Sequence, residues 1–218
     1  MLKIETNQIK AAMECVVTEK NDPRFYLRGV LLEITACGDV HLVSTDGERL
    51  FFGRIPAAKV QWGDVGGQTT SYESMKNGAK QFILPYDALK KATKLNRHMT
   101  FIEYMGEGVL NINGVTCLAI EGHFPDWRKV AETGFKTIKA ECPPMDWGRV
   151  ATVEKALREW SGSKTATVRV NGIGADGVGA LVTGDDHNAF ALVMPQKKKD
   201  ITPFITPNFP AALEAEKV

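Results

Sequence analysis

A glycine-rich segment, GIGADG at residues 172–177, is the first candidate for chemistry because it matches the GxGxxG pattern of dinucleotide-binding sites. In such sites a helix follows the glycines, and its N-terminus meets the pyrophosphate. Here the glycines precede VGALV at residues 178–182, an apolar run typical of a strand. We therefore interpret them as a hairpin turn. The sequence contains no GxxxxGKS/T, GxSxG or HExxH motif, so we predict a protein that is not an enzyme and needs no cofactor.

Cysteine, histidine and aspartate side chains are the next candidates, as metal ligands. The DDH triplet at residues 185–187 lies between two apolar runs, which favours a polar hairpin loop over a metal site. The cysteines are scattered without CxxC spacing, so we expect reduced, structural thiols. They are Cys15, Cys37, Cys117 and Cys142. The sequence predicts no metal site.

Basic side chains recur on the three segments with helical periodicity. Lys90, Lys94 and Arg97 fall at i, i+4 and i+7, on one face of the second predicted helix. Lysines on a helix usually form only its solvated face, but a row of basic helices would suit sequence-independent contact with phosphates. The candidate DNA contacts are Lys10, Lys90, Lys91, Lys94, Arg97, Arg149, Lys155 and Arg158.

The elements that must position these side chains follow a repeated order. Alternating apolar and polar residues on both sides of Asp46-Gly47 predict a hairpin, because Gly tolerates the positive φ of a tight turn. With the segments before it, the hairpin completes a β-α-β-β-β unit. This unit has a strand at 2–5, a helix at 7–20, and strands at 26–34, 40–45 and 49–55.

The same order recurs twice more along the chain. The second unit has a strand at 81–84, a helix at 86–97, and strands at 99–104, 108–113 and 115–122. The third has a strand at 135–140, a helix at 145–160, and strands at 165–170, 177–183 and 189–194. Such repetition usually means that one unit cannot bury its apolar face alone. We predict an α+β fold with a domain at 1–130 made of units 1–57 and 78–130, a third unit at 131–197, and a tail at 198–218.

The composition is that of an ordinary globular protein, with 44% hydrophobic and 24% charged residues in a chain of 218. A formal net charge of +1 gives no global attraction to nucleic acid, so a DNA-facing surface would require local segregation of charge. The sequence shows neither an apolar run long enough to cross a bilayer nor a signal peptide. We therefore expect a cytoplasmic protein without a membrane partner.

Four motifs, taken in order, resemble the bacterial DNA polymerase III beta subunit, the DNA sliding clamp. They are RFYLRGVLLE from Arg24, VSTDGERL from Val43, FPDWRKV from Phe124 and FALVMPQ from Phe190. That family has a YLxG strand, an ATDGHRL hairpin, an FPDYRRV segment joining two domains, and a VVMP ending. The resemblance implies the DNA-clamp fold, in which paired β-α-β-β-β units form a ring with helices lining the channel and sheets outside. Residues 1–130 would be one complete clamp domain, and the third unit half of another.

The resemblance also implies a cleft that binds short peptide motifs of polymerases and clamp loaders. An apolar wall with a polar rim would suit this role, although several positions could equally be core or turn residues. Glu48 stands where the family has His, and Lys129 where it usually has Arg, so the cleft could prefer a different and more basic peptide. Carried over motif by motif, the cleft residues are Leu27, Thr45, Gly47, Arg49, Leu50, Pro125, Val130, Leu192, Met194 and Pro195.

The unit count bears on assembly, because rings of this family hold about twelve units. Four copies of a three-unit chain would supply that number. We predict a homotetramer joined third unit to third unit and first unit to first unit, with a trimer that contains an unrecognised fourth unit as the alternative. The brevity of the chain suggests a phage or mobile element as its source.

The function that follows is that of a polymerase processivity factor. The protein would encircle duplex DNA without reading its sequence, with a DNA polymerase and an ATP-driven clamp loader as partners. The alternative is a clamp-like interaction protein that acts as a decoy or regulator of a host clamp without encircling DNA. A ring of fixed stoichiometry that stimulates processive synthesis distinguishes the first from the second.

Overall fold

The computed structural model describes residues 1–63, 80–94, 98–136, 138–139, 144–163, 165, 167–173, 179–184 and 186–195, with backbone alone at 133–136 and 138–139. The predicted tail at 198–218, most of the connection at 56–77, and Arg97 lie outside these residues. Within them the chain forms an α+β structure, as predicted, and its strands form two antiparallel sheets.

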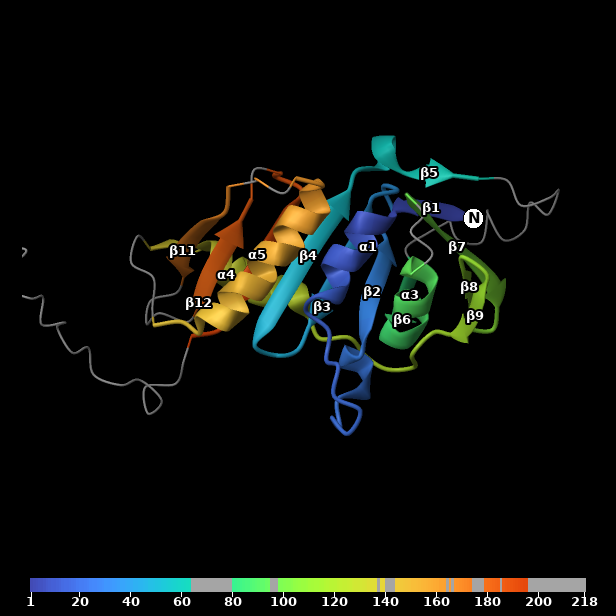
Figure 1. Cartoon of the computed structure of the whole chain (residues 1–218), viewed down its shortest axis with the longest axis horizontal. Helices are drawn as coiled ribbons and strands as arrows, with labels where there is room; N and C mark the ends of the chain where they lie inside the picture. Colours follow the sequence, from blue (N-terminus) through green and yellow to red (C-terminus); the bar gives the residue numbers. More distant parts are fainter. Residues whose placement is uncertain are drawn as a thin grey trace, which may run out of the picture.

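Three units follow one another along the chain (Figure 1). The first contains β1 (Leu2–Glu5), α1 (Thr6–Met13), β2 (Gly29–Ile34), β3 (Val40–Thr45) and β4 (Arg49–Ile55). The second contains β6 (Lys80–Pro85), α3 (Tyr86–Thr93), β7 (Met99–Gly106), β8 (Val109–Ile112) and β9 (Val115–Leu118). The third contains β10 (Ile138–Lys139), α5 (Trp147–Ser161), β11 (Arg169–Ile173), β12 (Gly179–Thr183) and β13 (Ala189–Val193). The connections add two 3₁₀ turns (Phe25–Leu27 and Ala57–Lys59), β5 (Gln61–Trp62) and α4 (Trp127–Lys136).

The first and second units exchange their first strands. β1 pairs antiparallel with β7 of the second unit, so that Leu2 lies opposite Ile102. β6 pairs with β2 of the first unit, so that Leu84 lies opposite Val30. Each sheet therefore needs a strand from the other unit, which joins the two into one structural body. β10 of the third unit instead pairs with β11 of its own unit.

One pair of strands attaches the third unit to the first. β13 runs antiparallel to β4, from Ala189 opposite Gly53 to Val193 opposite Arg49. The larger sheet thus has the order β10-β11-β12-β13-β4-β3-β2-β6, and the smaller sheet β5-β1-β7-β8-β9. The first unit therefore lies between the third unit, on the β4 side, and the second unit, on the β2 side. The predicted first-to-first joint between copies is therefore wrong, because β13 already occupies the edge of β4.

The helices of the three units lie side by side on one face of the sheets, with α1 between α5 and α3 (Figure 1). Ile9 of α1, Leu89 of α3 and Val153 of α5 are buried in one continuous core with the strand side chains that face them. The sequence sets the limits of α5 clearly. Asp146 Oδ1 accepts from the Gly148 N–H at 2.8 Å, and Gly162 ends the helix with a φ of 67°. We call this face the helix layer.

The opposite face of the larger sheet carries a second core beneath α4. The Trp127 ring lies 4.8 Å from the Phe52 ring, which in turn stacks on Phe190 at 4.9 Å. Phe124 and Ala131 are buried in the same cluster. The connecting segment between the second and third units is therefore packed onto the sheet rather than exposed as a linker.

Several predicted boundaries are wrong. α1 ends at Met13 instead of Lys20, because the chain turns back there and the Val17 N–H donates to the Leu27 carbonyl at 3.0 Å. The strand predicted from Tyr26 starts at Gly29, after a 3₁₀ turn. The strand predicted at 135–140 is shortened to β10, since α4 extends to Lys136. The strand predicted at 165–170 begins at Arg169.

Gly53 of β4 leaves room for the indole of Trp160, and we expect Gly53→Ala to destabilise the fold. A Cβ at this position would lie 2.3 Å from Trp160 Cζ3, and the ring is held because its Nε1 donates to Asp186 Oδ2 at 3.0 Å. Overpacking of this kind costs about 1–3 kcal/mol of the free energy of unfolding, which urea denaturation measures. Gly184→Ala, whose Cβ meets Leu157 Cβ at an ordinary 3.8 Å, is the matched control. Equal losses in both variants would contradict the expectation.

Candidate functional site

The side chain of Asp46 organises the tip of the β3–β4 hairpin. Its Oδ1 accepts from the N–H groups of Glu48 at 2.9 Å and Arg49 at 2.7 Å, and its Oδ2 accepts from Arg49 Nε at 2.8 Å. Gly47 has the positive φ, 90°, that the sequence predicts for this turn. The tip is therefore fixed by the chain itself and presents its side chains in one arrangement.

The four motifs converge on the outer face of the larger sheet. Leu192 of β13 lies opposite Leu50 of β4, and both share a core with Leu27. The Met194 N–H donates to the Glu48 carbonyl at 2.8 Å, which holds the end of the third unit against the hairpin tip. Segments that are far apart in the sequence thus meet here, as the predicted cleft requires.

The predicted cleft residues differ in their exposure. Leu27, Leu50 and Leu192 are almost fully buried, so they contribute to the core. Val130 and Met194 are 47% and 42% exposed, and their apolar side chains are available to a partner. We call these five residues the outer patch. Of the remaining predicted residues, Thr45 is buried, Arg49 and Pro195 are half-buried, and Gly47 and Pro125 are exposed.

A pocket of about 390 Å³ lies between the hairpin tip and residues 16–24. Arg24 spans it, since its guanidinium donates to both carboxylate oxygens of Asp22 at 3.0 and 2.7 Å and to the Asp46 carbonyl at 3.1 Å. Gly47 and Arg49 line the same pocket. Arg24 is absent from the predicted cleft residues, which follow from the family resemblance alone. Its place at the start of the RFYLRG motif was the signal that could have identified it.

Glu48, the main departure from the clamp motif, forms an ion pair within the chain. Its Oε1 lies 2.8 Å from Arg149 Nη2 in the first turn of α5, and Arg149 Nε lies 3.7 Å from Asp146 Oδ2. Arg149, predicted to contact DNA, is thus positioned at the hairpin tip. Because the Glu48 charge is balanced here, Glu48 no longer supports the expectation of a more basic peptide.

A buried carboxylate holds α4 on the outer face. Glu33 of β2 is 6% exposed, accepts from Gln81 Nε2 at 2.8 Å, lies 2.9 Å from His41 Nδ1, and pairs with Arg128. Burial raises the pKa of Glu33, but the hydrogen bonds from His41, Arg128 and Gln81 outweigh burial and lower the pKa to about 2. The Arg128 guanidinium also lies over the Trp127 ring, 4.3 Å from its centroid. These contacts fix the beginning of α4 and therefore the position of Val130.

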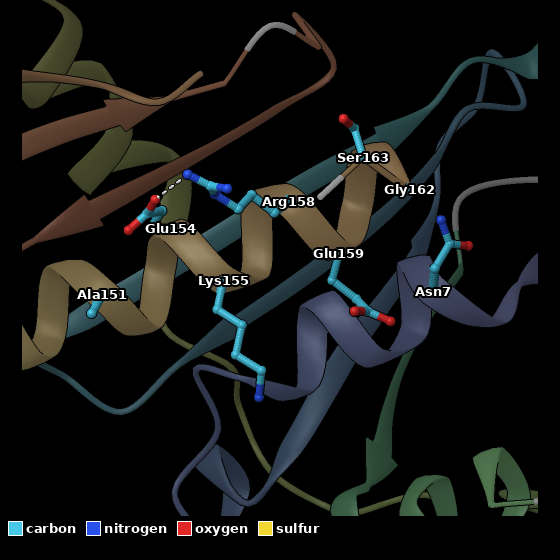
Figure 2. Close-up of a pocket in the computed structure, with 8 residues that line it drawn as sticks. All are labelled: Asn7, Ala151, Glu154, Lys155, Arg158, Glu159, Gly162 and Ser163. Carbon is cyan, nitrogen blue, oxygen red and sulfur yellow. Dashed lines mark hydrogen bonds and ion pairs between the residues drawn. The ribbon is translucent and has the colours of Figure 1, made fainter. Parts of the chain in front are cut away.

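The cations of α5 are paired with carboxylates on the helix layer. Arg158 Nη2 lies 2.6 Å from Glu154 Oε1 (Figure 2). Lys155 Nζ lies 2.7 Å from Glu14 Oε1. A shallow pocket of about 670 Å³ opens beside them, between α1 and α5. Intrahelical and interhelical pairing reduces the positive potential that these residues can offer to phosphates.

The lysines of α3 differ from the cations of α5 in their lack of carboxylate partners among the described residues. Lys90, Lys91 and Lys94 are exposed and form no ion pair with any other residue that the structure describes. Lys10 of α1 is half-buried and likewise unpaired among those residues. Arg97 lies outside the described part of the chain. The unneutralised positive charge of the helix layer is thus concentrated on α3.

The other candidate sites have structural explanations. Gly172 lies in β11 opposite Ala180, so the first glycine of the GxGxxG match is in a strand, whereas residues 174–178 lie outside the described part. Asp186 accepts from Trp160 Nε1 and from the Asn188 side chain. Among the described residues, no cluster of His, Cys, Asp and Glu could hold a metal ion. In the same part of the chain, no helix is long and apolar enough to span a membrane.

Comparisons with known proteins bear on the fold. No protein-family model and no curated protein sequence matches the chain. The DNA polymerase III subunit beta of Pseudomonas aeruginosa matches with a TM-score of 0.60 at 17% identity, over 89% of this chain and 65% of that one. The Helicobacter pylori beta clamp bound to a DNA ligase peptide gives 0.62 at 14%, over 90% and 66%. The Bacillus subtilis DNA polymerase sliding clamp gives 0.60 at 14%, over 90% and 64%.

The chain has the DNA sliding-clamp fold. The predicted α+β clamp architecture is therefore confirmed. This chain spans slightly less than two thirds of the length of those clamps, 64–66%. At such low identity the likeness extends to the fold, and the roles of individual clamp residues remain predictions.

Glu33 and its partners His41, Gln81 and Arg128, here called the Glu33 cluster, predict how the stability of this clamp fold depends on pH. The pKa of Glu33 in the folded state is lower than its ordinary value of 4.5, so its contribution is present above that value and is lost as the pH falls toward about 2. We expect Glu33→Gln to lower the free energy of unfolding by about 1–3 kcal/mol at pH 7 and to flatten its decline between pH 5 and 2. Glu121→Gln, at an exposed position, is the control. An unchanged acid profile in Glu33→Gln, measured by chemical denaturation, would show that this cluster does not anchor α4.

Proposed function

We propose that this chain is the subunit of a DNA sliding clamp that raises polymerase processivity. The observation that carries the proposal is the separation of two surfaces on a clamp fold. The helix layer displays the α3 lysines, which have no ion pair with any described residue, and the outer patch displays Val130 and Met194 on the opposite face of the sheet. A ring built from such subunits would turn the first surface toward DNA and leave the second accessible to partner proteins.

The outer patch has the features of a site for a short apolar peptide. Val130 precedes the buried Ala131 on α4, and Met194 follows the buried Leu192 by two residues, so both exposed side chains lie beside the outer core. The hairpin tip, which is joined to Met194 through the Glu48 carbonyl, is preorganised by Asp46. Arg24 and Arg49 line the adjoining pocket, where each is already ion-paired, with Asp22 and Asp46, so they would form a fixed polar rim for a peptide backbone. The expected partners are a DNA polymerase and a clamp loader that carry such peptides.

The helix layer has the features of a sequence-independent DNA contact. Lysine side chains can attract phosphates without reading base edges, and such attraction leaves a clamp able to slide. The α3 lysines provide this charge directly. The paired cations of α5 would contribute only after exchanging a carboxylate for a phosphate.

Truncating the two exposed apolar side chains of the outer patch tests the peptide site. We expect Val130→Ala with Met194→Ala to weaken binding of a fluorescent DNA ligase peptide, of the kind bound by the Helicobacter pylori clamp, by roughly tenfold in anisotropy titrations. Met105→Ala removes another exposed apolar side chain, which lies on β7 and outside the patch, and should bind normally. Leu50→Ala is unsuitable, since Leu50 is buried and its truncation would leave a cavity. Full affinity in the double variant would mean that the site lies elsewhere.

Neutralising the α3 lysines tests the DNA-facing surface. The triple variant Lys90→Ala, Lys91→Ala and Lys94→Ala should bind duplex DNA more weakly. In a plot of log affinity against log salt, its slope should become shallower by about 0.9 for each phosphate that these lysines neutralise in the wild type. Lys59→Ala, in the 3₁₀ turn at Ala57–Lys59, is the control outside the helix layer and should retain the slope. Identical slopes for wild type and triple variant would contradict binding of DNA by α3.

A further inference from the structure

The pairing of β4 with β13 has a nearly two-fold internal symmetry. Phe51, the third residue of β4, lies opposite Ala191, the third residue of β13, and both side chains are buried toward the helix layer. A two-fold axis through this pair, perpendicular to the sheet, would exchange the strands and keep all helices on the same side. The joint is thus formed by the last strand of one unit against the last strand of another.

β9 is the last strand of the second unit, and it pairs with no described strand on its outer side. It ends the order of the smaller sheet, and Leu118 at its end is 65% exposed. The whole segment from Gly108 to Ile120 contains no charged residue and no proline. Exposed edge strands are normally protected by charge, proline or a covering segment. An uncharged edge with an exposed leucine is instead suited to the addition of a strand.

We propose that β9 of one copy pairs antiparallel with β9 of a second copy, with Cys117 opposite Cys117 of the partner subunit. This rests on the proposed function only in that the joint would serve to close a ring. Cys117 is the third residue of β9, the position held by Phe51 and Ala191 in the internal joint, and it also packs against the core on the helix side. Thr116 then lies opposite Leu118 of the partner subunit. The second-to-second joint replaces the first-to-first joint and is isologous.

Cross-linking tests the register directly. Opposed residues of an antiparallel pair have Cα atoms about 4.5–5.5 Å apart, within the range that a disulfide spans. In a Cys37→Ser, Cys142→Ser variant of the full chain, oxidation with copper(II)–phenanthroline should give a covalent dimer through Cys117. Cys15 remains as a fully buried thiol. Adding Cys117→Ser should abolish the dimer, and a dimer that persists would contradict the proposal.

Neighbouring positions provide the matched controls. In the background without Cys37, Cys117 and Cys142, Thr116→Cys alone should give little dimer, because the two copies of residue 116 are not opposed. A mixture of Thr116→Cys and Leu118→Cys chains should cross-link to each other. Efficient self-linking by Thr116→Cys together with no linking through Cys117 would overturn the proposed register.

The particle mass measured by light scattering tests the joint without any cross-linking. Leu118→Lys places a charge on the β9 edge and should halve the particle mass measured by light scattering. Met105→Lys adds the same charge at another exposed apolar position, in β7, and should leave the mass unchanged. A wild-type mass of three protomers, or an unchanged mass in Leu118→Lys, would overturn the joint. Circular dichroism of both variants confirms that each is folded.

The outcome separates this joint from the proposed function. If wild-type protein stimulates processive synthesis while Leu118→Lys keeps its full mass, the β9 joint is wrong and the clamp function stands. If Cys117 cross-links and Leu118→Lys halves the mass, but no polymerase is stimulated and DNA binding does not depend on the α3 lysines, the joint stands and the clamp function fails.

Discussion

The antiparallel ladder between β4 and β13 is the interaction on which the rest of the molecule depends. It connects the first unit to the third across more than a hundred residues of intervening sequence, and it continues one sheet through both. Because side chains alternate along each strand, this register sends Phe51 and Ala191 to the helix layer and Leu50 and Leu192 to the outer patch. A shift of one residue would exchange these two sets and expose both cores.

The two faces of the larger sheet are stabilised by different means. The helix layer is an apolar core shared by α1, α3 and α5, so its helices are positioned by packing. The outer face depends on one connecting segment, which is held by aromatic stacking at Trp127 and by the buried Glu33 cluster. A buried carboxylate is favourable only when its hydrogen bonds are satisfied, and here three partners satisfy it. The position of the outer patch therefore depends on a polar anchor, whereas the helix layer depends on apolar contacts.

Charge is distributed unevenly over these surfaces. The α5 cations are neutralised by Glu14, Glu48 and Glu154, while those of α3 are exposed without such partners in the described chain. This explains how a chain with a net charge of +1 can still offer a local basic surface. The Glu48–Arg149 pair has a further consequence, since it joins the hairpin tip to the start of α5 and so links the outer patch to the helix layer.

Local pattern in the sequence determined the units, the Asp46-Gly47 turn and the caps of α5, because these depend on residues that are close in the chain. The ordered motifs also predicted the clamp fold. Tertiary structure alone decided the exchange of β1 and β6, the order third, first, second, and the early end of α1 at Met13. It also decided that Arg149 and Lys155 are ion-paired and that Leu50 is buried. Strand partners, ion pairs and burial arise between residues distant in sequence, and no periodicity within a single segment records which edge or charge another segment will meet.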